Sequence, residues 1–136
     1  MRTEKKQRLA QLRHWRVRRK ISGTKERPRM SVCFTNENIH VQFIDDHAGV
    51  TLAAVSTTGK ATPDRDKLAA NVASAKVVGK LAAETALARG IKTVVFDRGN
   101  ARYHRSESKG KDGKPGLVFG KRATLAEAAR AAGLKF

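Results

Sequence analysis

Apolar and polar residues alternate along two stretches in the first third of the chain. The apolar positions are Met30, Val32, Phe34, Ile39, Val41 and Phe43. A period of two is typical of a strand with one buried face. The polar segment 36–38 separates the two stretches, and a second polar turn at 45–49 is followed by a third apolar run at 50–56. The pattern predicts a three-stranded antiparallel meander.

A polar loop and then a long run of small apolar residues follow the meander. The loop, residues 57–66, ends at Asp64 or Asp66, either of which is a candidate helix N-cap. Small or apolar residues then recur every three or four positions from 67 to 89, which predicts a helix lying close on the sheet. This face consists of Leu68, Val72, Ala75, Gly79, Ala82 and Ala86. Gly90 is placed as a C-cap glycine that ends the helix.

The segment 92–99 is the most continuously apolar strand candidate. Its Val94-Val95-Phe96 run predicts a strand that is covered on both faces and central in the sheet. Because a helix precedes it, this strand should run parallel to a meander strand through a right-handed crossover. Asp97-Arg98-Gly99 follows at its carboxyl end, where open α/β sheets bind their ligands.

The N-terminal segment is predicted to be a basic helix. Residues 2–20 contain no Pro or Gly, and Leu9, Leu12 and Trp15 form one thin apolar line on it. Repulsion among its cations should keep this helix mobile when free and let it become ordered on a polyanion. The alternative is a solvated, disordered tail. Residues 21–28 read as a linker.

The C-terminal segment completes the predicted fold. A capping box at 124–127 predicts a helix start, and Gly133 predicts its end. The fold class is therefore α/β, with a three-stranded antiparallel meander plus one parallel strand after a crossover helix (β-β-β-α-β-α) and a basic helical N-terminal extension. Residues 1–28 form the extension and linker, and residues 29–136 form the α/β core domain.

Charge is distributed unevenly along the chain. The formal net charge of +17 and the isoelectric point of about 11.0 indicate a polyanionic partner, either a nucleic acid or an anionic membrane surface. Residues 1–30 carry a net charge of +10 and residues 98–122 carry +6, whereas residues 31–97 are neutral. This distribution is typical of a folded body whose extensions contact a phosphate backbone.

Several classes of function are disfavoured by what the chain contains. Cys33 is the only cysteine, so the sequence predicts no disulfide, no cysteine-based metal site and a reducing compartment. The histidines lack metal-ligand spacing, and the lysines and glycines of 109–114 lack P-loop order and read as a flexible basic loop. No residue has a context for nucleophilic activation. We therefore expect no enzyme activity, no cofactor, no metal and no small-molecule substrate.

An RNase-H-like nuclease is the strongest enzymatic alternative, because β-β-β-α-β opens that fold and Asp97 ends its fourth strand. The other metal-binding carboxylates are missing from the expected strand and helix positions. A membrane-surface protein is disfavoured by the thin apolar line of the N-terminal helix. The chain has no apolar run long enough for a membrane span or a secretory signal, which predicts a soluble cytosolic protein. An organellar transit peptide is the alternative, although Glu4 is atypical of one.

Guanidinium groups and rings gather directly after the 92–99 strand. This mixture pairs with phosphates and stacks on unpaired RNA bases. For Tyr103 the alternative is a lid over the apolar core, and for Trp15 it is packing on the chain's own surface. The candidate RNA-binding residues are Arg8, Arg13, Trp15, Arg16, Arg18, Arg19, Lys20, Lys25, Arg27, Arg29, Arg98, Arg102, Tyr103, His104, Arg105, Lys121 and Arg122.

Short segments along most of the chain resemble a known family. They are 16–21, 23–24, 26–29, 44–46 with Gly49, 51–53, 56–57, 94–99, 103–104, 126–130 and 132–134. Together and in this order they resemble the bacterial-type large-ribosomal-subunit protein that binds 5S ribosomal RNA, the L-eighteen family. The resemblance implies a compact α/β domain that binds 5S rRNA and helps attach it to 23S rRNA in the central protuberance, beside neighbouring large-subunit proteins.

The same resemblance implies no catalysis and a location in the cytoplasmic ribosome, with an organellar ribosome as the alternative. It implies that Arg16, Arg18, Arg19, Lys20, Arg27, Arg29 and the 98–104 segment lie near RNA. The chain departs from the family in a first hairpin turn that is not basic, in Asn100 where a glycine is common, and in an apparent insertion at about 105–119. The insertion is hypothesised to contact RNA or a neighbouring protein. A general nucleic-acid-binding protein is the remaining alternative.

Overall fold

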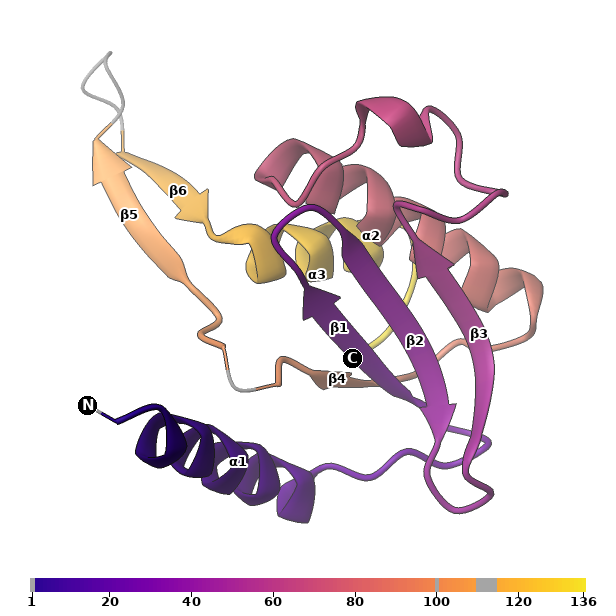
Figure 1. The fold of residues 1–136 in the computed structure, drawn as a ribbon. Coiled ribbons are helices and arrows are strands. Elements are labelled where there is room, and N and C mark those ends of the chain that lie inside the picture. Colours follow the sequence, from indigo (N-terminus) through magenta and orange to yellow (C-terminus); the bar gives the residue numbers. More distant parts are fainter. Residues whose placement is uncertain (1, 100, 110–114) are drawn as a thin grey trace.

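The computed structural model describes residues 2–99, 101–109 and 115–136 (Figure 1). Its elements are α1 (Thr3–Lys20), β1 (Arg29–Phe34), β2 (Ile39–Asp45), β3 (Val50–Ser56), the short 3-10 helix η1 (Arg65–Lys67), α2 (Val72–Ala88), β4 (Val95–Asp97), β5 (Arg105–Lys109), β6 (Pro115–Phe119) and α3 (Lys121–Ala131). The expectations for Asn100 and for a flexible loop at 110–114 lie outside the described residues.

The main sheet has the strand order β3-β2-β1-β4, which confirms the antiparallel meander and the parallel fourth strand. Met30 lies opposite Phe43 and Val32 opposite Val41, and all four are buried. α2 and α3 lie together behind the sheet in Figure 1 and cover this apolar face. On the other face the alternate residues are less buried, with Cys33 and Gln42 exposed and Ser31 and His40 half-buried. Period-two alternation therefore located one core face, as predicted.

β4 is an edge strand, which corrects the prediction that 92–99 is central. It pairs along one side with β1 only and spans three residues. Val95 and Phe96 are half-buried, so the strand is not covered on both faces. The C-terminus covers part of this edge, because the N–H of Val94 donates to the carbonyl of Lys135 at 3.0 Å and the rings of Phe96 and Phe136 stack at 5.4 Å. Packing at the edge thus accounts for the apolar run.

α2 packs through small residues, as predicted, but starts later than expected. Two positions of the predicted core face are therefore wrong: Leu68 precedes the helix, and Val72 in its first turn is 46% exposed. Asn71 is its N-cap, and its side chain accepts from the N–H of Ser74 at 2.7 Å. The predicted cap Asp64 has a left-handed φ of 51° and precedes η1 without a side-chain cap bond. The C-terminal prediction is confirmed, because Gly90 follows the helix with a φ of 79°.

α3 begins at Lys121 with Gly120 as its N-cap, so the predicted capping box at 124–127 is wrong. Thr124 lies inside the first turn, where its Oγ1 donates to the carbonyl of Phe119 at 3.4 Å, and Glu127 points to another partner. The predicted end is confirmed, with Gly133 at a φ of 106°.

The segment 105–119, predicted only as a basic loop, contains an antiparallel two-stranded hairpin. Arg105 pairs with Phe119 and Glu107 with Leu117. At its base the N–H of Gly120 donates to the carbonyl of His104 at 2.8 Å. Figure 1 shows the hairpin extending away from the sheet and helices, with β5 and β6 as a separate sheet.

Candidate nucleic-acid interface

α1 is an exposed, strongly basic helix. It buries none of its residues, and Trp15 on its thin apolar line is 54% exposed. Glu4 lies in the first turn and three cations lie in the last, which suits the helix dipole. In Figure 1 the helix lies outside the layered body, below β4. The predicted helix is confirmed, and its side chains are available to a partner.

Asp46 is the anchor between α1 and the folded body. Its two carboxylate oxygens accept from Nη1 and Nη2 of Arg18 at 3.2 and 3.0 Å. They also accept from Nε and Nη2 of Arg29 at 3.0 and 3.1 Å, and from the N–H of Gly23 at 2.7 Å. Hydrogen bonds from Arg29, and then those from Arg18 and Gly23, hold the pKa of Asp46 well below its usual range despite partial burial. The carboxylate therefore stays ionised and paired at neutral pH.

Arg29 lies inside this network. Its Nη1 donates to the buried carboxylate of Asp97 at 2.9 Å while its other nitrogens contact Asp46. Burial by itself lowers the pKa of Arg29, but the hydrogen bonds and attraction from the two carboxylates raise it overall. Arg29 is thus 9% exposed, and its guanidinium is committed to internal partners.

Asp97 has a structural role at the end of β4. One oxygen accepts from Arg29, and the other accepts from the N–H of Gly99 at 2.8 Å, which turns the chain after the strand. Among the described residues no group of three His, Cys, Asp or Glu side chains could hold a metal ion. The carboxylate that suggested a nuclease is therefore engaged in holding the fold.

The segment after β4 presents cations and one half-buried ring. Arg98, Arg102, His104 and Arg105 are exposed. Tyr103 instead packs edge-on against Phe96, with ring centroids 6.1 Å apart, and its hydroxyl donates to Oε1 of Glu127 at 3.1 Å. Burial and then the hydrogen bond to Glu127 raise the pKa of Tyr103. This placement agrees with the lid alternative for Tyr103.

Two other candidates also have internal contacts. Nη1 of Arg122 donates to the carbonyl of Val32 at 2.7 Å, its guanidinium lies 5.4 Å from the centre of the Phe34 ring, and burial lowers its pKa. Arg27 is exposed, but its Nε approaches the carbonyl of Val94 at 3.4 Å. Arg122 therefore belongs mainly to the packing of α3 against β1.

Thirteen of the seventeen candidates are exposed. They are Arg8, Arg13, Trp15, Arg16, Arg19, Lys20, Lys25, Arg27, Arg98, Arg102, His104, Arg105 and Lys121. Arg18 and Tyr103, like Arg122, are half-buried. The sequence pattern places Asp46 in the polar turn at 45–49 and does not reveal its role as an anchor. The sequence feature that could have indicated this role is the acidic pair 45–46 in a chain with a basic N-terminal extension, because opposite charges favour a contact between them.

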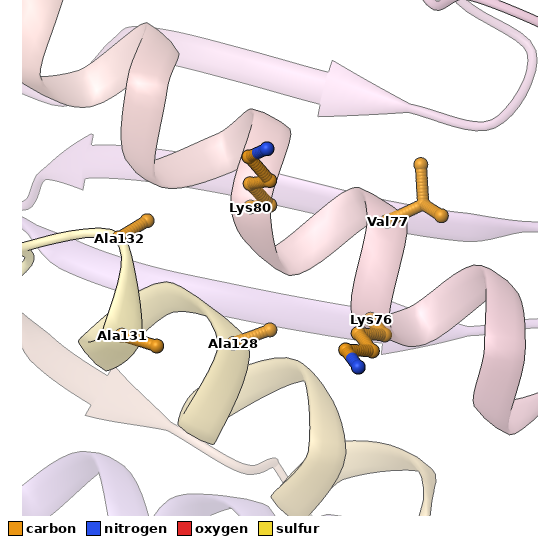
Figure 2. A pocket seen from close by; sticks show the side chains of 6 residues that line it. All are labelled: Lys76, Val77, Lys80, Ala128, Ala131 and Ala132. Atoms are coloured by element: carbon orange, nitrogen blue, oxygen red, sulfur yellow. The ribbon is translucent and has the colours of Figure 1, made fainter.

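A shallow groove lies between α2 and α3 (Figure 2). Its volume is about 380 Å³, and it is lined by Lys76, Val77, Lys80, Ala128, Ala131 and Ala132. The lining consists of aliphatic side chains and two lysines, with no hydroxyl, thiol, carboxylate or imidazole group. In the described part of the chain, no helix is long and apolar enough to span a membrane. The candidate site is instead the set of exposed cationic surfaces on α1 and on the segment after β4.

The comparison with known families agrees with this site. A family model described as ribosomal L18 of archaea, bacteria, mitochondria and chloroplasts matches residues 3–108. That range includes α1, the Asp46 network and β4. The chain belongs to the ribosomal L18 family. The predicted resemblance is therefore confirmed, and the matched range ends inside β5, so the second half of the hairpin lies beyond it.

Individual relatives of the L18 family are similar over nearly the whole chain. The large ribosomal subunit protein uL18 of Lacticaseibacillus casei is 49% identical over 131 residues, covering 96% of this chain and 95% of the relative. The uL18 proteins of Alkaliphilus oremlandii and Dictyoglomus turgidum are 47% and 44% identical over 124 and 128 residues, covering 91% and 94% of this chain and 89% and 93% of the relatives.

Membership of the L18 family fixes the general role of the protein. It is a structural constituent of the large ribosomal subunit and not an enzyme. Association with ribosomal RNA and with other ribosomal proteins follows from this role. The exposed cations of α1 and of the 98–105 segment form surfaces that are chemically able to pair with RNA phosphates.

Proposed function

We propose that this L18 protein binds 5S rRNA and helps attach it to 23S rRNA in the central protuberance. The observation that supports the proposal is the exposure of α1, which buries no residue and carries eight Lys or Arg against one Glu. Phosphate contacts by such cations provide most of the affinity of a basic protein for RNA.

A second cationic surface supports an attachment role. Arg98, Arg102 and His104 lie on the segment between β4 and the hairpin, far from α1 in the sequence. Two cationic surfaces on one protein can contact two RNA segments at the same time. We assign α1 to 5S rRNA and the segment 98–105 to the neighbouring RNA.

The test measures the affinity of the full chain for a 5S rRNA transcript and for an unrelated RNA of matched length over a series of salt concentrations. For roughly eight phosphate contacts we expect a log-log slope of about −6 to −7. We also expect tighter binding of the 5S transcript at every salt concentration. Equal affinity for both RNAs would reduce the protein to a general nucleic-acid binder, and metal-dependent cleavage of either RNA would support a nuclease.

A matched pair of charge variants assigns the contact to α1. In the first variant Arg8, Arg13, Arg16 and Arg19 are replaced by Gln, and in the control Lys60, Lys67, Lys76 and Lys80 are replaced by Gln. Both variants lose four positive charges from exposed positions. The α1 variant should flatten the slope by about 3, whereas the control should leave it near the wild-type value. The same change in both variants would contradict a specific role of α1.

The hairpin offers a further surface, for which we propose a neighbouring large-subunit protein. Leu117 and Val118 are 48% and 46% exposed, and an isolated two-stranded hairpin is marginally stable without a partner. Replacing residues 106–118 by a short glycine linker between the closely spaced ends should preserve affinity for 5S rRNA and reduce incorporation into reconstituted large subunits. Normal incorporation would contradict this assignment.

A further inference from the structure

Apart from the backbone that follows it, α1 is held to the body by one side chain, which lies near its C-terminal end. Among the described residues, Arg18 is the α1 side chain that hydrogen-bonds to the folded body, through the paired bonds to Asp46 at 3.0 and 3.2 Å. The other side-chain bond of the helix, from Nε of Arg13, returns to the carbonyl of Leu9 in α1 itself. The helix has no buried residue that could fix its direction by packing.

We propose that Arg18 is a latch and not a phosphate ligand: its ion pair with Asp46 sets the direction in which α1 leaves the body and so preorganises the other α1 cations for RNA. The proposal rests on the proposed RNA-binding function. It makes Arg18 and Asp46 positioning residues, in contrast to the RNA contact that family resemblance implies for Arg18.

The geometry commits Arg18 to the protein. Both of its terminal nitrogens face Asp46 in the fork arrangement that guanidinium and carboxylate groups form, and its side chain is 29% exposed. Asp46 is 16% exposed and is also held by Arg29 and by the N–H of Gly23. A phosphate that captured Arg18 would have to replace two charge-assisted bonds. Arg16 and Arg19, two residues before and one residue after Arg18, are exposed and form no ion pair within the described part of the chain, so a phosphate could bind them without that competition.

The connection between helix and body is short enough for one ion pair to control it. The N–H of Ile21 still donates to the carbonyl of Val17 at the end of α1, and Gly23 exchanges bonds with Asp46 through both its N–H and its carbonyl. An added Cβ at Gly23 would lie 2.3 Å from the carbonyl oxygen of Ile44, so the chain passes tightly against the body there. Ser22 is the remaining joint, and the Arg18 bond restrains rotation about it.

Two outcomes distinguish a latch from a phosphate contact in RNA binding. Removing a phosphate ligand lowers the magnitude of the salt slope by about 0.7 to 0.9, whereas loss of preorganisation lowers affinity with the slope unchanged. We expect Arg16→Gln to reduce the slope by that amount. We expect Arg18→Gln to weaken binding about three- to tenfold at constant slope.

Arg18→Lys separates charge from geometry. A lysine keeps the positive charge but cannot form the fork with Asp46. The latch predicts that Arg18→Lys weakens binding as Arg18→Gln does, whereas a phosphate ligand would tolerate lysine. The fold should survive in both variants because Asp46 retains Arg29 and Gly23. Unfolding curves in urea check this point.

A direct measurement in the absence of RNA completes the test. Cys33 is the only cysteine and is exposed, so spin labels on Cys33 and on a second cysteine introduced as Gln7→Cys report the distance between the body and α1. We expect a narrow distance distribution with Arg18 and a broad one with Arg18→Gln. An unchanged distribution, or a slope for Arg18→Gln reduced as in Arg16→Gln, would overturn the proposal. Failure of the wild type to bind 5S rRNA would overturn the proposed function alone, and the label distances would still decide the latch.

Discussion

α1 and α2 are helices of nearly equal length, 18 and 17 residues, that are held in opposite ways. α2 buries seven residues, which are Ser74, Ala75, Val78, Gly79, Ala82, Ala83 and Ala86. α1 buries none and is tied to the body through Arg18. Helicity alone therefore says little about role. A face of small residues lets α2 pack as part of the body, whereas the many exposed cations of α1 make it an extension that presents charge to a partner.

The two helices also differ in charge, and the more exposed helix is the more basic one. α1 carries eight Lys or Arg and one acid, whereas α2 carries Lys76, Lys80 and Glu84. Like charges three or four residues apart destabilise an isolated helix, so the helical form of α1 should become more stable when a polyanion screens these charges. α2 has no such dependence because burial of its apolar face stabilises it. The stability of the body and the affinity for RNA should thus be separable by mutation.

The largest expected effect comes from removing residues 2–16 while keeping the Arg18 latch. The deletion removes six cations, and if each contacts a phosphate the salt slope should lose about 4 to 5 of its magnitude. The free energy of unfolding should stay within about 0.5 kcal/mol of the wild type because the segment buries nothing. Binding titrations and urea unfolding measure the two quantities. A truncated chain that unfolds would contradict the separation of roles.

Asp46→Asn should have the next largest effect, and on stability. The substitution leaves the guanidinium of Arg29 with one carboxylate, so we expect a loss of about 2 to 3 kcal/mol in the free energy of unfolding at neutral pH. Because the pKa of Asp46 is lowered on folding, its contribution is complete above the unfolded pKa of about 3.9 and is lost as pH falls through the folded value.

Urea unfolding at decreasing pH checks this prediction. The difference between the wild type and Asp46→Asn should shrink as pH falls below about 4. Asp66→Asn is the matched control, because the Asp66 side chain is 97% exposed and should change stability little at any pH. A difference that persists undiminished in acid would show that the ionised carboxylate is not the stabilising group.

The comparison of the two helices also shows what the sequence could predict. The alternating Met30, Val32 and Phe34 and the periodic small residues of α2 each repeat one local pattern, and both were confirmed. The position of β4 at the edge of the sheet could not be predicted from the residues of the strand itself. Its apolar run is the same whether two strands flank it or one strand and a C-terminal segment do, and the contact with Phe136 is formed only in the folded chain.

The start of α3 and the pairing of the arginines also could not be predicted from local sequence patterns. A capping box at 124–127 has the right spacing, but α3 continues through it because Gly120 and Lys121 already begin the helix. Charge counting located the cationic surfaces but could not tell which cations are paired. Arg16 and Arg18 are equivalent by composition, and only the folded position of Asp46 separates them.

Gly79→Ala tests the packed helix and should have a smaller effect. Alanine ordinarily stabilises a helix by about 1 kcal/mol relative to glycine. At Gly79, however, the added Cβ would lie 2.4 Å from the carbonyl oxygen of Leu125 and 3.0 Å from Cβ of Ala128, so α3 must shift. We expect a net loss of about 1 to 2 kcal/mol in the free energy of unfolding.

The control for Gly79→Ala is the reverse change at an exposed position of the same helix. Ala73→Gly changes helix propensity at an exposed position in the first turn and should lose less than about 1 kcal/mol in the free energy of unfolding. The salt slope for RNA should be unchanged in both variants. A stabilised Gly79→Ala protein would mean that α2 and α3 can separate at little cost.

The smallest expected effect belongs to Tyr103→Phe. It tests whether the Tyr103 side chain stabilises the fold, as α2 does, or contacts RNA, as we propose for α1. The substitution removes the hydrogen bond to Glu127 but keeps the edge contact with Phe96, so we expect a loss of about 0.5 to 1 kcal/mol in the free energy of unfolding. RNA affinity should not change, because the hydroxyl already has an internal partner. Weaker binding without a change in stability would instead make the Tyr103 hydroxyl an RNA contact, and it would join the exposed cations beside it in the interface.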